Sequence, residues 1–131
     1  MALPRFYASS LVVAAGLATP LAGCSRPAAP TEIDPAQGVL SDIWEMYDGY
    51  VLQHHKPPTQ MSDFKGLQVP FPRGHTELTA GRYVVRFGTP LEPAGKLLAY
   101  PKDAPQKGGM VLLNDGTTKS MTADEIQAAI K

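Results

Sequence analysis

The chain has 131 residues, and its 12 basic and 12 acidic side chains give a formal charge of zero. That length accommodates one domain, and the balanced charge provides no field that would gather nucleic acid. Cys24 is the only cysteine, so no disulfide can form within the chain and a packed core has to stabilise it. We therefore expect one small domain without a nucleic-acid partner.

The N-terminal 23 residues have the organisation of an export signal. Arg5 provides a positive start, an apolar run covers residues 11–18, and Pro20 ends it because proline lacks the amide hydrogen that a helix interior needs. Leu21-Ala22-Gly23-Cys24 follows, and this stretch resembles the lipobox of bacterial lipoproteins. The resemblance implies cleavage between Gly23 and Cys24, residues 1–23 as the signal peptide, and lipidation of the Cys24 sulfur.

The same segment allows two other interpretations, an ordinary secretory signal that contains a cysteine or an uncleaved anchor. Removal of residues 1–23 takes away one basic residue and no acidic one, which leaves 108 residues with a formal charge of −1. No second apolar run approaches the roughly 20 residues that cross a bilayer. We therefore expect acyl chains on Cys24 to hold the protein to a membrane of the cell envelope. By the same resemblance, Ser25 implies the outer membrane, with the domain facing the periplasm.

Residues 24–35 are expected to form an acylated tether, because Pro27 and Pro30 favour extended conformers. A helix then begins. Asp34 can cap its free amide groups, Pro35 suits its first position and Gln37 can reach back to the cap. Apolar residues recur on one helical face as far as His55, and they are Leu40, Ile43, Trp44, Tyr47 and Val51. This helix is the first element of a single domain over residues 36–131.

Beyond the helix, the pattern predicts one further helical turn over residues 59–65, capped by Thr59 or Ser62. Residues 67–75 contain two prolines and a glycine, which predict a loop. Strands are expected over 82–87, 96–100, 110–113 and 117–121. The third strand is apolar on successive residues, which predicts that it is covered on both faces.

The C-terminal region is the most clearly patterned. Asp115-Gly116 predicts a two-residue hairpin turn with positive φ at both residues, and Thr122 with Glu125 predicts a capping box before a helix over 123–130. The expected fold class is α+β. A long N-terminal helix packs on an antiparallel meander of three to four strands, and a short helix ends the chain.

Candidate catalytic or metal-ligating groups are few. His54, His55 and His75 are the obvious ligands, but adjacent helical residues point about 100° apart, and neither a cysteine nor a suitably spaced carboxylate completes a set. Asp115 is a weak candidate carboxylate displayed by its turn. No Gly-x-Ser-x-Gly elbow is present for a serine nucleophile. We expect no cofactor, no metal and no catalytic residue.

The C-terminal third carries a second resemblance. Residues 98–105, 108–117 and 121–125 look like the tail of small lipoproteins of planctomycete-type bacteria, and the Leu-x-Asp-Gly hairpin resembles the end of pseudopilin-like secretion proteins. The chain departs from pseudopilins because it has no prepilin cleavage site, and Pro105 stands ten residues before Asp115, where a histidine is expected. The resemblance implies a small envelope lipoprotein.

These observations favour a non-enzymatic, lipid-anchored envelope module that acts by contact with an envelope protein, as an accessory of secretion or envelope assembly. The second hypothesis is a small sugar- or peptide-binding module with a groove between helix and sheet, and the third is a hydrolase. A flat apolar face favours the first hypothesis, whereas polar side chains that converge in a cleft favour the second or third.

Overall fold

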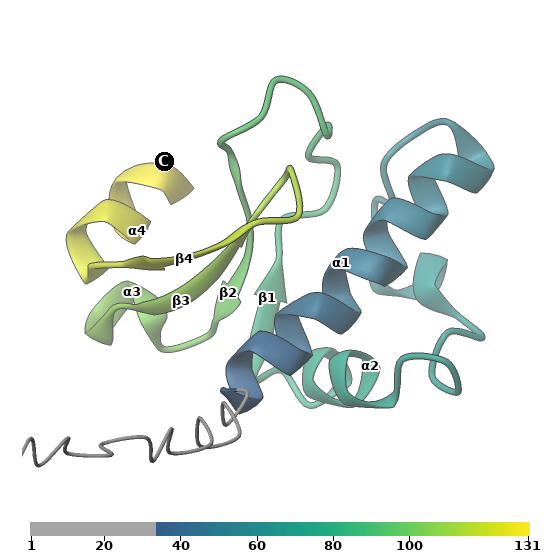
Figure 1. Cartoon of the computed structure of the whole chain (residues 1–131), viewed down its shortest axis with the longest axis horizontal. Coiled ribbons are helices and arrows are strands. Elements are labelled where there is room, and N and C mark those ends of the chain that lie inside the picture. Colours follow the sequence, from purple (N-terminus) through teal and green to yellow (C-terminus); the bar gives the residue numbers. More distant parts are fainter. Residues whose placement is uncertain (1–33) are drawn as a thin grey trace, which may run out of the picture. The chain divides into compact units, whose positions relative to one another are not determined.

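The computed structural model describes residues 34–131. The expected signal, the lipobox with Cys24 and the tether as far as residue 33 lie outside the described residues. No helix within residues 34–131 combines the length and the apolar character needed to cross a membrane. The elements follow in the order α1 (Pro35–His54), η1 (Met61–Phe64), α2 (Pro72–Thr79), β1 (Tyr83–Val85), β2 (Leu97–Pro101), α3 (Ala104–Lys107), β3 (Gly109–Leu113), β4 (Thr118–Met121) and α4 (Ala123–Ile130) (Figure 1).

The strands form one antiparallel sheet in the order β1-β2-β3-β4, so the predicted α+β fold class with a meander is confirmed. The register between β2 and β3 shifts between Leu97 and Ala99. Such a shift places one extra residue in a strand and turns its side chain relative to strict alternation. Leu98 and Ala99 therefore belong to the same core cluster, while Leu97 belongs to the other.

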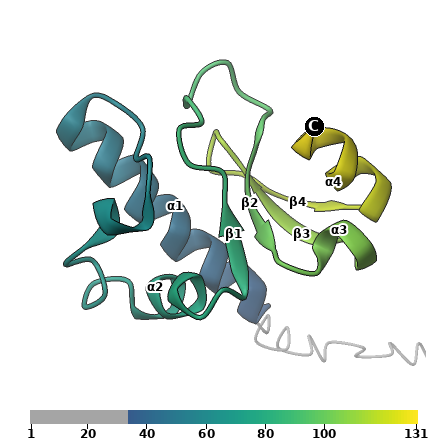
Figure 2. The same ribbon diagram turned by 180° about the vertical axis from the view of Figure 1, so that it is seen from behind.

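Helices cover both faces of the sheet. Figures 1 and 2 show α1 and α2 on one side of the strands and α3 and α4 on the other. The neighbours Val111 and Leu112 in β3 are both fully buried, and each belongs to a different cluster. The prediction that this strand is covered on both faces is therefore confirmed.

The long helix α1 has the predicted cap and first-turn proline and ends next to His55, whereas no capping box with Gln37 is seen within the described residues. The Asp34 carboxylate accepts a hydrogen bond from the Ala36 amide at 2.9 Å, and Pro35 takes the first position. His55 ends the helix with a left-handed backbone, φ 55°. The predicted apolar face points inward. Leu40, Ile43 and Tyr47 are fully buried, and Trp44 and Val51 are half-buried.

The expectation of a loop over residues 67–75 is wrong, because helix α2 begins at Pro72. The proline and glycine that predicted a loop are the residues that this helix requires. Proline suits a first helical turn, where its missing amide hydrogen costs nothing. Gly74 approaches α1 so closely that its amide donates to the Asp42 carboxylate at 3.0 Å, and an added Cβ would lie 2.6 Å from Asp42 Cβ. Asp42 therefore anchors α2.

Two smaller elements also differ from expectation. The helical turn η1 is present, but Gln60 precedes it in place of Thr59 or Ser62 as the cap, and the Asp63 carboxylate binds the amides before the turn. The connection between β2 and β3, expected as a plain loop, contains helix α3. Ala104 at its start is fully buried against the second core cluster.

The β3–β4 hairpin forms, although its turn is not the predicted one. Leu113 donates to the Thr117 carbonyl at 2.9 Å, and Gly116 donates to the Leu113 carbonyl at 3.1 Å. Only Gly116 in this turn has a positive φ, 86°. The loop therefore has three residues and ends on a left-handed glycine.

The C-terminal helix starts with the predicted capping box. The Thr122 hydroxyl accepts from the Glu125 amide at 3.3 Å, and the Glu125 carboxylate accepts from the Thr122 amide at 2.8 Å. At the other end of α4, the Arg86 guanidinium donates to the Ala129 carbonyl at 2.9 Å. Both ends of the helix are therefore fixed by hydrogen bonds.

Candidate binding cleft

A cleft of about 450 Å³ opens between the C-terminal half of α1 and the segment that carries η1 and leads to α2. Its volume lies in the range of small ligand sites, roughly 300 to 1,000 Å³. The apolar side chains of its lining are buried or half-buried, and the polar ones form the rim. The lining consists of Glu45, Met46, Gly49, Tyr50, Gln53, His54, Asp63, Lys65, Leu67 and Phe71. It lies between a helix and a helical turn, not between helix and sheet.

The α1 wall of the cleft carries a stacked pair of rings. Tyr50 and His54 lie one helical turn apart, a spacing that brings side chains together. Their ring centroids are 4.1 Å apart and the planes are inclined by 30°. Met46 lies one turn before Tyr50 and is only 1% exposed. The wall therefore changes from a buried thioether to an exposed imidazole within two turns.

Asp63 lies on the opposite rim, and hydrogen bonds to one of its two carboxylate oxygens hold it in place. Oδ2 accepts hydrogen bonds from the Thr59 amide at 2.8 Å, the Thr59 hydroxyl at 3.3 Å and the Gln60 amide at 3.3 Å. The backbone hydrogen bond from Thr59 is the main reason that the pKa of Asp63 lies below its ordinary value of 3.8. The Gln60 side chain also lowers the pKa of this carboxylate. Asp63 is thus a carboxylate oriented by the residues before the turn, and it takes part in no ion pair within residues 34–131.

Gly49 lies at the cleft in the middle of α1. A glycine at such a position costs roughly 1 kcal/mol relative to alanine. A Cβ built on Gly49 would meet no atom of another part of the described chain within 4 Å. The packing of the domain therefore gives no reason for a glycine here, in contrast to Gly74, where a Cβ would collide with α1.

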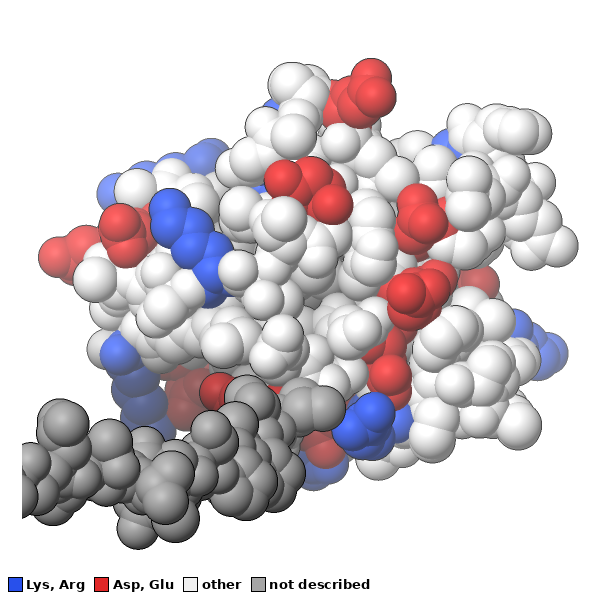
Figure 3. Space-filling view, in the orientation of Figure 1, with Lys and Arg blue, Asp and Glu red and all other residues white. Residues whose placement is uncertain are grey.

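The cleft is set in an acidic surface. Helix α1 contains Asp42, Glu45 and Asp48 and no lysine or arginine, and Figure 3 shows acidic side chains gathered over its middle. Glu45 and Asp63 take part in no ion pair within the described residues, whose two pairs are Arg82–Glu77 and Lys107–Asp103. Lys65 is the one basic side chain of the lining. The unpaired carboxylates give the cleft a net negative charge.

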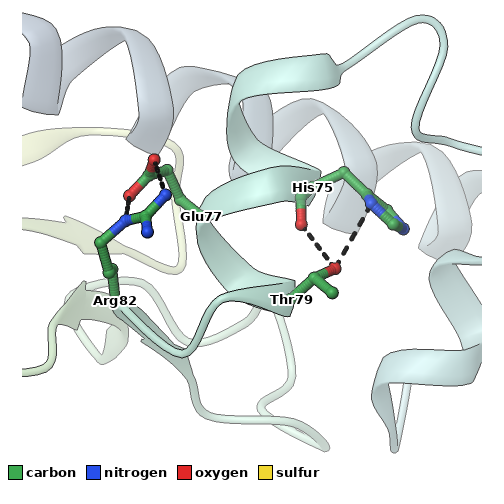
Figure 4. Close-up of polar contacts among 4 residues, drawn as sticks. All are labelled: His75, Glu77, Thr79 and Arg82. Atoms are coloured by element: carbon green, nitrogen blue, oxygen red, sulfur yellow. Dashed lines mark hydrogen bonds and ion pairs between the residues drawn. The ribbon is translucent and has the colours of Figure 1, made fainter.

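The three candidate histidines lie in different surroundings. His54 lines the cleft, whereas the exposed His55 forms the left-handed end of α1. His75 lies on α2, where the Thr79 hydroxyl donates to its carbonyl at 2.8 Å and lies 3.5 Å from its Nδ1 (Figure 4). Within residues 34–131, no three side chains of the metal-binding types form a group that could hold an ion.

Asp115 has a role in its own turn. Its carboxylate accepts from the Thr117 hydroxyl at 2.6 Å and from the Thr117 amide at 3.0 Å. These hydrogen bonds lower the pKa of Asp115 below 3.8, with the hydroxyl as the larger cause. The carboxylate is exposed and does not line the cleft. Its observed contacts are those of a turn residue.

A wider groove of about 710 Å³ lies where α2 meets the edge of the sheet, with Glu77, Arg82 and Asp103 in its wall. The Arg82 guanidinium donates to both Glu77 oxygens, at 2.6 and 2.7 Å (Figure 4). Asp103 pairs with Lys107 at 3.0 Å. The charges of both acids in this groove are therefore matched within the chain, unlike those of the cleft.

Of the residues that the sequence singles out as candidates, only His54 contributes to the cleft. Glu45 lies off the apolar face of α1, which predicts no more than a solvated acid, and Asp63 belongs to a turn whose capping pattern predicts a different residue. Gly49, like Gly38, is a glycine inside the helical pattern, which lowers the stability of the helix relative to alanine. This is the signal that the sequence offers at the cleft.

Comparisons of the chain with protein-family models, with curated proteins and with solved structures return no match.

Proposed function

We propose that the protein is a lipid-anchored module of a bacterial cell envelope, held by acyl chains on Cys24 at the outer membrane and facing the periplasm. The observation that carries this proposal is the sequence Leu21-Ala22-Gly23-Cys24 directly after an apolar run and a basic start. The described domain begins at Asp34, ten residues after Cys24, and that length of chain spans at most about 35 Å. The anchor would thus keep the domain close to the bilayer.

We further propose that the domain acts by non-enzymatic contact with an envelope partner, as an accessory of secretion or envelope assembly. The lining of the cleft brings together carboxylates, an amide, aromatic rings and an apolar floor, an arrangement that favours binding of a peptide or sugar. We therefore propose that contact with the partner is made through this cleft and not through a flat apolar face. Helix α1 has 20 residues and is about 30 Å long. The tether precedes the first residue of α1 in the chain, whereas the cleft is lined by the second half of that helix.

The anchoring is tested by membrane fractionation of the wild-type protein and of Cys24→Ser. The wild type should sediment with membranes and enter solution only with detergent, whereas Cys24→Ser should remain unprocessed or become soluble. Ser41→Ala, an exposed change on α1, serves as the control and should behave as the wild type does. A soluble wild-type protein, or a processed Cys24→Ser protein that still needs detergent, would contradict the proposal.

A further inference from the structure

The cleft combines two carboxylates that form no ion pair within residues 34–131, those of Glu45 and Asp63, with open space at Gly49. We propose that the cleft binds a basic segment of a partner protein and seats one lysine or arginine side chain between Glu45 and Asp63. This inference rests on the proposed function, because it specifies the partner that the anchored domain contacts.

The shape and chemistry of the cleft fit such a side chain. Lysine and arginine carry an apolar stem and a charged end. The stem would lie on the floor formed by Met46 and Phe71, and the cation would lie near the Tyr50 ring, whose face attracts positive charge. The carboxylates of Asp63 and of the exposed Glu45 would accept hydrogen bonds from the cation, which are stronger than those between neutral groups. The positive charge of Lys65 at the rim balances one of the two negative charges, so the lining keeps one excess negative charge.

The position of Gly49 favours an occupant that brings its own backbone close to α1. Glycine is the residue that permits such an approach, because it has no Cβ. Glycine at position 49 lowers the stability of α1 but leaves space on the outer surface of this helix. No atom of another part of the described chain lies within 4 Å of the Cβ position of residue 49. A peptide that lies across Gly49 would use that space.

The acidic surface around the cleft favours a peptide over a single sugar or a small cation. Glu45 in the cleft lining and Asp48 are three residues apart, which are neighbouring positions on a helix surface. Asp42, a further three residues back, is already held by the Gly74 amide. An extended chain with more than one positive charge can match two neighbouring carboxylates, whereas one sugar ring cannot.

The inference is tested by NMR titration of the whole nitrogen-15-labelled protein in detergent micelles with three probes. These are an acetylated and amidated Lys-Ala-Lys peptide, the same peptide with norleucine in place of both lysines, and N-acetylglucosamine. The lysine peptide should shift the amide signals of Gly49, Tyr50 and Leu67, and the other two probes should not. Glu45→Gln should weaken binding roughly tenfold, the effect of losing one charge-assisted contact. Asp124→Asn on α4, which removes the same charge away from the cleft, should leave the affinity unchanged.

Gly49→Leu provides a second test, because it fills the cleft while replacing glycine with a better helix former. Its melting temperature should be no lower than that of the wild type, and binding of the lysine peptide should be lost. Equal binding of the norleucine peptide, shifts caused only by N-acetylglucosamine, unchanged binding by Gly49→Leu, or no shift at the cleft with any probe would overturn the inference. A protein that fractionates with membranes and fails this titration refutes the cleft assignment alone, whereas a soluble protein that binds the peptide refutes the anchoring alone.

Discussion

The indole ring of Trp44 on α1 covers Gly116 in the β3–β4 hairpin, so closely that a Cβ on Gly116 would lie 2.7 Å from Cε2 of Trp44. Gly116 also has φ 86°, a conformation that residues with a Cβ adopt at a cost. Glycine is therefore required there for two separate reasons, backbone conformation and space. The contact joins the first helix to a hairpin some 70 residues later in the chain.

Gly116→Ala separates these reasons when it is compared with Gly66→Ala. Gly66 has a similar φ of 90°, but a Cβ there would meet nothing within 4 Å. Gly66→Ala should lower the free energy of unfolding by about 1 kcal/mol through backbone strain. Gly116→Ala should lower it by about 2 to 4 kcal/mol, because the clash with Trp44 adds to the strain. Urea unfolding measures both, and equal losses would show that the indole does not restrict Gly116.

Asn114 is fully buried and holds the loop between β1 and β2. Its Nδ2 donates to the carbonyls of Pro90 and Pro93, at 2.8 and 2.9 Å, and its Oδ1 accepts from the Lys96 amide at 2.9 Å. Asn114→Ala should lower the free energy of unfolding by about 2 to 4 kcal/mol, because the buried side chain is lost together with its three hydrogen bonds to the loop backbone. Hydrogen exchange at Lys96 should accelerate. Asp115→Asn, at the exposed neighbouring position, is the control, and an equal loss in both variants would contradict this account.

Tyr47 predicts a dependence of stability on alkaline pH. It is fully buried, its hydroxyl donates to the Thr89 carbonyl at 2.7 Å, and burial raises the pKa of Tyr47 from 10.0 to about 12. Because the folded state holds the proton more tightly, this contribution to stability is fully present below pH 10 and is lost as pH rises towards 12. Tyr47→Phe should cost about 1 kcal/mol at pH 7. Its stability should also fall less steeply than that of the wild type between pH 10 and 12, whereas parallel pH profiles would show that Tyr47 does not titrate in this way.

Gly49→Ala and Gly74→Ala should change stability in opposite directions, although both place the same methyl group on a helix. Gly49→Ala should raise the free energy of unfolding by about 0.5 to 1 kcal/mol, because the helix gains propensity and nothing is displaced. Gly74→Ala should lower it by about 1 to 3 kcal/mol, because its Cβ would lie 3.1 Å from the Ile43 amide nitrogen as well as against Asp42. Thermal unfolding measures both changes in stability. A lower stability of Gly49→Ala than of the wild type would show that the fold itself requires glycine at this position.

The elements that local patterns specify were predictable from the sequence. Helix α1 has a cap, a proline at its first position and an apolar face, and α4 has a capping box whose two hydrogen bonds both form. Each of these signals lies within a few residues of the structure that it specifies. The α+β class was predictable because the spacing of apolar residues changes from helical to strand-like along the chain.

The features that sequence reasoning missed depend on contacts between distant segments. Pro72 and Gly74 predict a loop in isolation, and only the approach of α1 shows why a helix needs a glycine there. The turn after β3 has three residues because Asn114 leaves the strand to bind the β1–β2 loop. The cleft was missed for the same reason, since Glu45 and Asp63 line one cleft only because η1 packs beside α1.

Intact-mass spectrometry of the protein extracted from membranes tests the central claim, that Cys24 anchors the protein, most directly. If Cys24 is lipidated, the chain should begin at Cys24 and carry the added mass of a diacylglyceryl group on sulfur, with at least the two acyl chains that stable anchoring requires. A chain that begins at Cys24 without added mass, or one that retains residues 1–23, would contradict the claim.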